Sequence, residues 1–253
     1  LLAAVLAVPM AITLTAGAVE AAAPGEEPSP STASAAYSGP VNSANARFIL
    51  DGYRTLLGRE PDTAGLDFHL DRLAAGGSRS RHAFTYSLLF SVEGSRGEVT
   101  RAYEDLLGRG VDDAGRIYWT AHLQGHGVLD LRVLLLASNE YRNRAGGTDQ
   151  AWIEALYLDV LGRTADPSGL AYWTGRAQAG VARPLIAAAI YQSDEALARR
   201  AITYYQEVLV RVPSTTERQG AVATIRRIGE RGLRAELLAS DEAYETHLRA
   251  ATS

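Results

Sequence analysis

Acidic side chains recur at intervals along this chain of 253 residues and could bind a cation. Asp62 and Asp67 lie close together in the sequence, as do Asp112 and Asp113, and Asp166 stands in a corresponding place further on. Calcium needs about six to eight oxygen ligands, and each of these segments offers few. An acid just before a helix also accepts hydrogen bonds from unpaired backbone N–H groups. We therefore predict helix caps, with metal binding at Asp62, Asp112 and Asp166 as the alternative.

Basic side chains precede these acids at a constant distance. They are Arg59, Arg109 and Arg163, with Arg211 in a fourth place. Guanidinium groups in a row could bind anions, because each presents several N–H donors in a fixed geometry. The favoured interpretation is that each arginine bonds carbonyl groups of its own loop or the neighbouring aspartate, an exposed contact of small energetic value.

No recognisable catalytic centre accompanies these residues. His122 and His126 have the spacing that can hold a metal on a helix, but Gly125 and Gly127 flank the second histidine and predict the end of that helix. The chain has no cysteine, and every one of its 25 basic residues is arginine, which excludes thiol and lysine chemistry. Motifs for serine hydrolases, zinc proteases and phosphate loops are absent from the sequence. We predict a protein that is not an enzyme and has no cofactor.

Aromatic side chains offer a further possibility, a surface on which sugar rings could stack. Trp119 and Trp173 stand on apolar stripes, so we expect them in the core. His69 takes the corresponding place in the first part of the chain and is interpreted as a core or boundary residue. Trp152 lies beside a stripe and is the better candidate for an exposed ring.

Composition and the first residues indicate the compartment. The formal net charge is -4 and the pI about 5.8, which argues against nucleic-acid binding. Residues 1–23 are apolar and end in small residues, as in a partial signal peptide, with a membrane anchor as the alternative. Residues 24–43 are rich in Pro, Ser, Ala and Gly and are expected to form a disordered linker. The mature chain should then be secreted or lie at the cell surface, without a membrane span.

The acids, arginines and aromatic residues described above belong to one motif that occurs four times. The third residues of the strings LLGR, LLGR, VLGR and VLVR lie at positions 58, 108, 162 and 210. We expect four units, at 44–98, 99–148, 149–199 and 200–253, with the divergent last unit as a capping copy. The motif residues assigned to shaping the unit are Tyr53, Gly58, Arg59, Asp62, Gly65, Tyr103, Gly108, Arg109, Asp112, Gly115, Trp119, Tyr157, Gly162, Arg163, Asp166, Gly169 and Trp173.

Each unit reads as a series of helices. Apolar residues before the first glycine recur at helical spacing, for example Ile49, Tyr53 and Leu56. The glycine suits a left-handed helix stop, and the acid after it caps a second helix. A glycine turn, a third apolar helix and a short helix that begins at a Ser-x-Glu sequence follow. The predicted fold is therefore all-α, with four units of roughly 50 residues packed side by side.

The motif, from Tyr53 to His69, Tyr103 to Trp119 and Tyr157 to Trp173, resembles the bacterial domain of unknown function 4214 family over roughly residues 45–250. The resemblance implies helical modules of secreted or surface-associated proteins and a fold similar to that of phycobilisome linker domains. It implies no catalytic residue. The chain departs from the pattern at His69 and Arg116, and the fourth unit has Val210 and Glu217 where the others have glycine.

We expect a secreted or envelope-associated interaction or structural module without catalytic activity. Its partner would be an extracellular protein or a cell-wall polysaccharide component. One alternative is an enzyme, or an accessory domain, that acts on extracellular polysaccharide. The other is a calcium-dependent surface protein.

Overall fold

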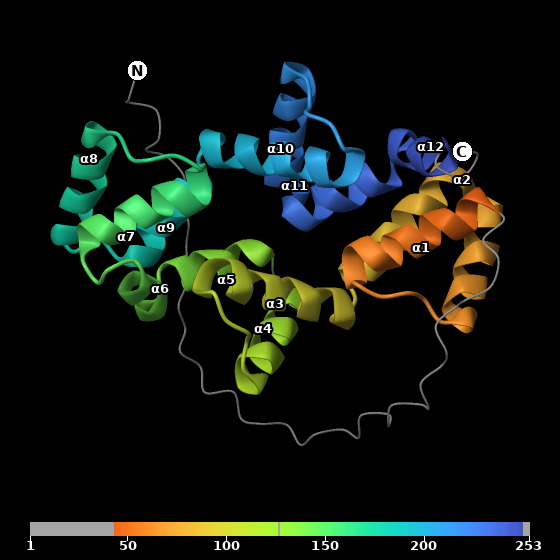
Figure 1. The fold of residues 1–253 in the computed structure, drawn as a ribbon, viewed down its shortest axis with the longest axis horizontal. Coiled ribbons are helices and arrows are strands. Elements are labelled where there is room, and N and C mark those ends of the chain that lie inside the picture. The colour runs from red at the N-terminus through yellow and green to blue at the C-terminus, as the bar shows by residue number, and fades with distance from the viewer. Residues whose placement is uncertain (1–42, 126, 250–253) are drawn as a thin grey trace. The chain divides into compact units, whose positions relative to one another are not determined.

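The computed structural model describes residues 43–125 and 127–249, which form helices without a β-strand. The predicted signal peptide, residues 24–42 of the predicted linker and His126 lie outside these residues, whereas Ser43, the last residue of that linker, caps α1. The helices are α1 (Ala44–Leu57), α2 (Thr63–Leu89), α3 (Val92–Leu107), α4 (Asp113–Gly125), α5 (Val128–Leu136), α6 (Asn139–Arg144), α7 (Asp149–Leu156), the π-helical η1 (Tyr157–Leu161), α8 (Pro167–Gln178), α9 (Arg183–Tyr191), α10 (Asp194–Leu209), α11 (Thr215–Ala239) and α12 (Asp241–Arg249) (Figure 1). The predicted all-α class is confirmed.

The first helix of every unit ends at the predicted glycine position. Gly58, Gly108 and Gly162 adopt left-handed backbone with φ of 71°, 66° and 70°. The amide groups of Gly58 and Gly108 donate to carbonyl groups four residues earlier, which closes the last turn. Val210 holds the same conformation with φ 55°, although a β-branched residue is disfavoured there. The fold therefore imposes this turn even where the glycine is lost.

The second and third helices of a unit are joined in two ways. In units 2 and 3 they are separate, as α4 and α5 and as α8 and α9. In units 1 and 4 the helix runs on as α2 and α11, but non-helical backbone at Gly77 and Gly229 divides each in two. The predicted glycine turn thus exists in all four units, as a break or as a kink.

The helix that begins at Ser-x-Glu differs from the expectation. Ser91 and Ser193 cap α3 and α10, which continue without interruption through the first helix of the next unit. α6 is short, because Gly146 and Gly147 adopt positive φ and Thr148 caps a new helix, α7. α12, which Ser240 caps, is also short and ends the described part of the chain. The predicted boundaries at 98/99 and 199/200 therefore fall inside continuous helices.

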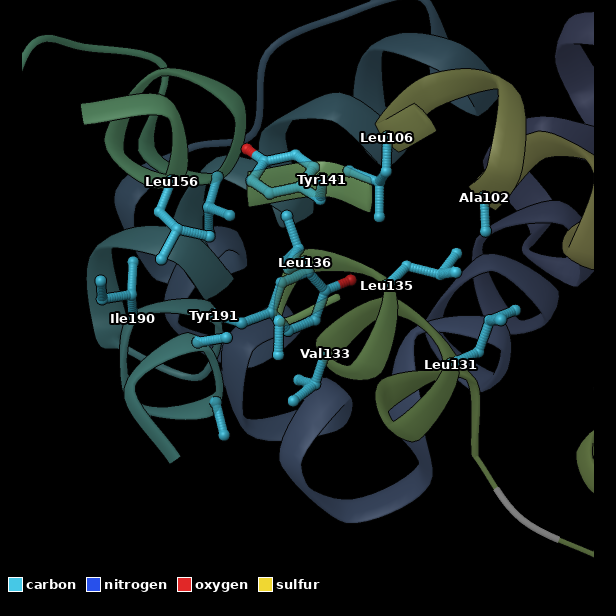
Figure 2. Close-up of a cluster of buried hydrophobic side chains, with 14 of the residues drawn as sticks. Ala102, Leu106, Leu131, Val133, Leu135, Leu136, Tyr141, Leu156, Ile190 and Tyr191 are labelled. Carbon is cyan, nitrogen blue, oxygen red and sulfur yellow. The ribbon is translucent and has the colours of Figure 1, made fainter. Parts of the chain in front are cut away.

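The four units share two separate hydrophobic cores, and one of these cores joins units that are not neighbours in the sequence. One core contains buried residues from Val99 to Ala196 and joins units 2 and 3. Figure 2 shows part of it, with Leu136 of α5 among Tyr141 of α6 and Leu156 of α7. The other core contains buried residues from Ala46 to Leu89 and from Leu197 to Ala243, which joins unit 1 to unit 4. Figure 1 accordingly shows α12 beside α1.

Two equivalent arginines reinforce this pairing. The Nε of Arg81 in unit 1 donates to the carbonyl of Ala239 in unit 4, at 3.1 Å, and its side chain pairs with Asp241. The Nε of Arg183 in unit 3 donates to the carbonyl of Ala137 in unit 2, at 3.0 Å. Each arginine satisfies a carbonyl at the end of a helix in its partner unit, so the two pairs of units are built alike.

Among the helices of residues 43–125 and 127–249, none combines the length and the apolar character that a membrane span requires.

Candidate functional site

The repeated arginines form the same set of contacts in all four units, which we call the Tyr–Arg–Glu clamp. Nε and Nη2 of Arg163 donate to the two carboxylate oxygens of Glu195 at 2.5 and 3.0 Å, and Nη1 donates to a carbonyl of its own loop at 3.2 Å. The guanidinium also lies over the Tyr157 ring, 5.1 Å from its centroid. The other clamps join Tyr53, Arg59 and Glu93; Tyr103, Arg109 and Glu140; and Tyr205, Arg211 and Glu242.

The clamp confirms the predicted loop contact and corrects the expected acidic partner. The arginine pairs mainly with the glutamate of Ser-x-Glu, about 30 residues later, rather than with the aspartate beside it. The bidentate bond to Arg109 lowers the pKa of Glu140 against a smaller effect of burial. The clamp ties the loop after a unit's first helix to the helix that begins at the Ser-x-Glu sequence of the same unit, and it uses donors on all three guanidinium nitrogen atoms.

The candidate metal residues act as helix caps. Carboxylate oxygens of Asp62, Asp112 and Asp166 accept hydrogen bonds from amide groups three residues later, at 2.6, 2.8 and 2.9 Å. A hydrogen bond from Ser168, followed by that cap, lowers the pKa of Asp166 to about 2. The three acids begin three different helices, and the described residues contain no group of three metal-binding side chains placed to share an ion.

The aromatic residues are placed differently from the prediction. Trp152, expected to be exposed, is fully buried, and its Nε1 donates to the carbonyl of Leu136 at 2.8 Å. Trp119 is half-buried against the core and donates to the Tyr103 hydroxyl at 3.2 Å. Tyr118 and Tyr172, which precede the tryptophans, are exposed, as is Phe68, which precedes His69. Helical spacing alone left Trp152 outside the buried stripe because the stripe is wider than expected and includes Trp152 beside Ile153 and Leu156.

The largest concentration of functional groups lies elsewhere, in a cavity of about 420 Å³ bordered by α3, α5, η1, α9, α10 and α11. It touches both cores. Its lining includes five arginines: Arg101, Arg132, Arg199, Arg200 and Arg234. It includes five acids: Glu98, Asp105, Asp159, Glu207 and Glu230. We call this the charged cavity. Its volume falls within the range of small-molecule sites, about 300–1,000 Å³, and such sites occur often where two compact parts of a protein meet.

One side of the charged cavity is built around Glu98 of α3. This carboxylate is buried, and its oxygens accept from Arg101 at 3.0 Å and from Arg132 at 3.1 Å. Burial raises the pKa of Glu98, but the charges and hydrogen bonds of Arg132 and Arg101 outweigh it and lower the value to about 2. Arg132 also lies 3.4 Å from Asp105. Glu98 therefore remains ionised at neutral pH.

The other side is built around Glu230 of α11. Its two oxygens accept from the hydroxyl groups of Tyr191 and Tyr204, each at 2.9 Å. Arg200 lies 3.0 Å from the same carboxylate, and its guanidinium lies 3.9 Å from the centroid of the Tyr191 ring. Burial, followed by the charge of Glu230, raises the pKa of Tyr191, so its hydroxyl stays protonated.

Sequence reasoning missed the charged cavity, although one signal was present. Ten residues before the helix-ending position, the four units carry Phe48, Glu98, Trp152 and Arg200. The two aromatic residues are buried in the two cores, whereas the two charged residues line the cavity. A charge at a position that is elsewhere apolar indicates a different environment for units 2 and 4.

A family model matches two parts of the chain. The model described as Domain of unknown function (DUF4214) matches residues 30–96 and 133–200, together just over half of the chain. The two matches start about two units apart. Comparison with curated proteins and with solved structures found no match.

Proposed function

The chain belongs to the DUF4214 family, and from this premise we propose that it is a non-catalytic interaction module that holds a partner in the charged cavity. The proposal places the protein outside the cell or in the cell envelope. Its partner would be a cell-wall polysaccharide component or an extracellular protein.

The observation that carries the proposal is the pairing of the charges in the cavity. A general acid or base works best with a pKa near the working pH. Glu98 has its pKa lowered to about 2 and is bonded to two arginines, while Glu230 accepts two tyrosine hydroxyl groups. The low pKa of Glu98 makes it unsuited to exchanging protons near neutral pH, and the hydrogen bonds to both carboxylates hold a fixed polar surface.

The extracellular location is supported by the sequence before the described residues. Residues 1–23 combine an apolar stretch with small residues at its end, which is typical of a secretory signal. The absence of cysteine means that neither an oxidising nor a reducing compartment would alter covalent links in the chain.

The direct test combines binding with turnover. The purified chain is incubated with cell-wall polysaccharide and with detergent-solubilised envelope protein, and both bound protein and released sugar ends are measured. We expect saturable retention on one of the two fractions and no released product. Release of sugar ends at a rate proportional to protein concentration would instead support the alternative of a polysaccharide-degrading enzyme.

A calcium-dependent surface protein is distinguished by repeating the binding with calcium or with a chelator. The acids that would hold the ion, such as Asp112, already accept a backbone hydrogen bond. We expect equal retention and an unchanged melting temperature in both conditions. A rise in melting temperature with added calcium would favour the calcium-dependent alternative.

A further inference from the structure

Equivalent residues of units 2 and 4 line the charged cavity in pairs. Asp105 and Glu207 both lie three residues before the helix-ending position, and Arg132 and Arg234 both lie six residues before the serine of Ser-x-Glu. Arg132 approaches Asp105 to 3.4 Å, and Arg234 approaches Glu207 to 3.9 Å. The cavity therefore presents the same combination, a guanidinium beside a carboxylate, twice.

These two pairs retain hydrogen-bonding capacity. The Nε atoms of Arg132 and Arg234 are covered by neighbouring atoms, so a ligand cannot reach them directly. Both side chains nevertheless line the cavity and are 17% and 13% exposed, so a ligand can reach other parts of them. The carboxylates of Asp105 and Glu207 are partly exposed, so their remaining lone pairs are accessible.

The chemistry of these pairs defines the ligand. A hydroxyl group can donate one hydrogen bond and accept two, so it can satisfy a guanidinium and a carboxylate at the same time. Five arginines and five acids balance one another around the cavity, and this balance provides no net attraction for an anion or a cation. Leu158, which is half exposed at the cavity, adds an apolar surface for C–H groups.

We propose that the charged cavity binds a neutral oligosaccharide, with hydroxyl groups of two sugar units facing the equivalent pairs Arg132–Asp105 and Arg234–Glu207. A ligand made of repeated units matches a lining made of repeated residues. This proposal rests on the proposed binding function and specifies its ligand.

The test uses the full chain and isothermal titration. The probes are neutral trisaccharides of glucose, mannose, galactose and xylose, and a trisaccharide of galacturonic acid. We expect saturable binding of at least one neutral trisaccharide with a Kd below about 1 mM, and weaker binding of the acidic one. Absence of binding by every neutral trisaccharide would overturn the proposal, even if the chain is retained by envelope protein.

A blocking variant locates the site. Thr203 lines the cavity from α10, is exposed, and donates its hydroxyl to the carbonyl four residues earlier at 3.2 Å. Thr203→Trp should fill part of the cavity and weaken binding at least about tenfold. Thr100 of α3 makes the same hydroxyl contact at 3.1 Å and does not line the cavity, so Thr100→Trp is the matched control. Equal affinity of the Thr203→Trp variant and the control would overturn the proposal.

A second variant preserves the shape of the cavity and tests the charge of the ligand. Asp105→Asn combined with Glu207→Gln removes two partly exposed negative charges. For a neutral ligand we expect about a tenfold loss of affinity that is insensitive to salt, because hydrogen bonds to charged groups are replaced by weaker ones. An increase in affinity that disappears at high salt would indicate an anionic ligand and would contradict the proposal. A measured turnover of the trisaccharide, in contrast, would overturn the non-catalytic function and leave the binding site in place.

Discussion

At the scale of single residues, the four units provide internal comparisons. Three units place glycine in the left-handed turn after the first helix, and the fourth places Val210 there. Its side chain is largely exposed, so packing contributes little to hold this conformation. The left-handed backbone of Val210 is therefore a local energetic cost in unit 4. It persists because all four units need the same turn at this position.

Replacing this valine should stabilise the protein. We expect Val210→Gly to raise the free energy of unfolding by about 1 kcal/mol. Relief of the left-handed backbone gains about 1–2 kcal/mol, and the larger conformational entropy that glycine loses on folding offsets part of this gain. Urea unfolding measures the change. The reciprocal variant Gly58→Val, at a position with nothing within 4 Å of the added Cβ, should lower stability by a similar amount. A destabilised Val210→Gly variant would contradict this explanation.

Glu98 is a buried carboxylate whose charge is held by two arginines. Glu98→Gln should lower the free energy of unfolding at pH 7 by about 3 kcal/mol, because it leaves the largely covered Arg132 with only the partly exposed Asp105 as a counter-charge. The pKa of Glu98 falls from an ordinary 4.5 to about 2, so its stabilising contribution is complete above pH 4.5 and is lost as the pH falls towards 2.

The measurement is therefore chemical unfolding of both proteins as a function of pH. The stability difference between them should be largest near neutral pH and should narrow between pH 4.5 and 2. Glu104→Gln on the same helix is the control, and its exposed side chain should alter stability by less than about 0.5 kcal/mol. A difference that is constant with pH would indicate that charge is not the cause.

At the scale of helices, the motif glycines in the first turn of the second helix allow the tyrosine of the first helix to lie close to its backbone. A Cβ added to Gly169 would lie 2.4 Å from the Tyr157 hydroxyl, and one added to Gly115 would lie 3.3 Å from that of Tyr103. The tyrosine reaches this position because the clamp arginine holds its ring. The tyrosine, the arginine and the glycine thus act together to set the angle between consecutive helices.

Gly169→Ala should lower the free energy of unfolding by about 1–3 kcal/mol, since the added methyl group overpacks the contact with Tyr157. The second change Tyr157→Phe removes the hydroxyl and should recover part of that loss, which a double-mutant cycle measures. Gly175→Ala lies on the same helix with no atom within 4 Å, so it should stabilise by about 0.5–1 kcal/mol. Equal effects at both glycines would remove the steric explanation.

At the scale of the whole molecule, the pairing of unit 1 with unit 4 distinguishes this chain from a linear array of repeats. In a linear array each repeat packs only on its neighbours in sequence. Here α1 and α2 share a core with α10, α11 and α12. Buried Arg231 of unit 4 also bonds the carbonyl of Leu89 in unit 1 and the hydroxyl of Ser95 in α3.

Damage to one core should therefore spread across distant parts of the sequence. Leu233→Ala should cost about 2–5 kcal/mol and increase amide hydrogen exchange in α1 and α2 as well as in α11. Leu136→Ala, in the other core, should instead increase exchange in α7 and α9. Exchange measured by mass spectrometry separates the two patterns. If Leu233→Ala left α1 protected as in the original chain, the pairing would be wrong.

The sequence by itself determined the helical class, the recurring unit, the caps and the turns, because these depend on hydrogen bonds and apolar spacing within a few residues. The family resemblance is also confirmed. The sequence did not determine the partner of the clamp arginine, the burial of Trp152 or the joining of α3 and α10 across units. Only the tertiary structure decided which units share a core and that Glu98 and Glu230 line one cavity.

The physical reason is that the apolar faces of similar units can pack on one another in several ways. The choice among them depends on contacts between residues more than 100 positions apart, such as Arg81 with Ala239.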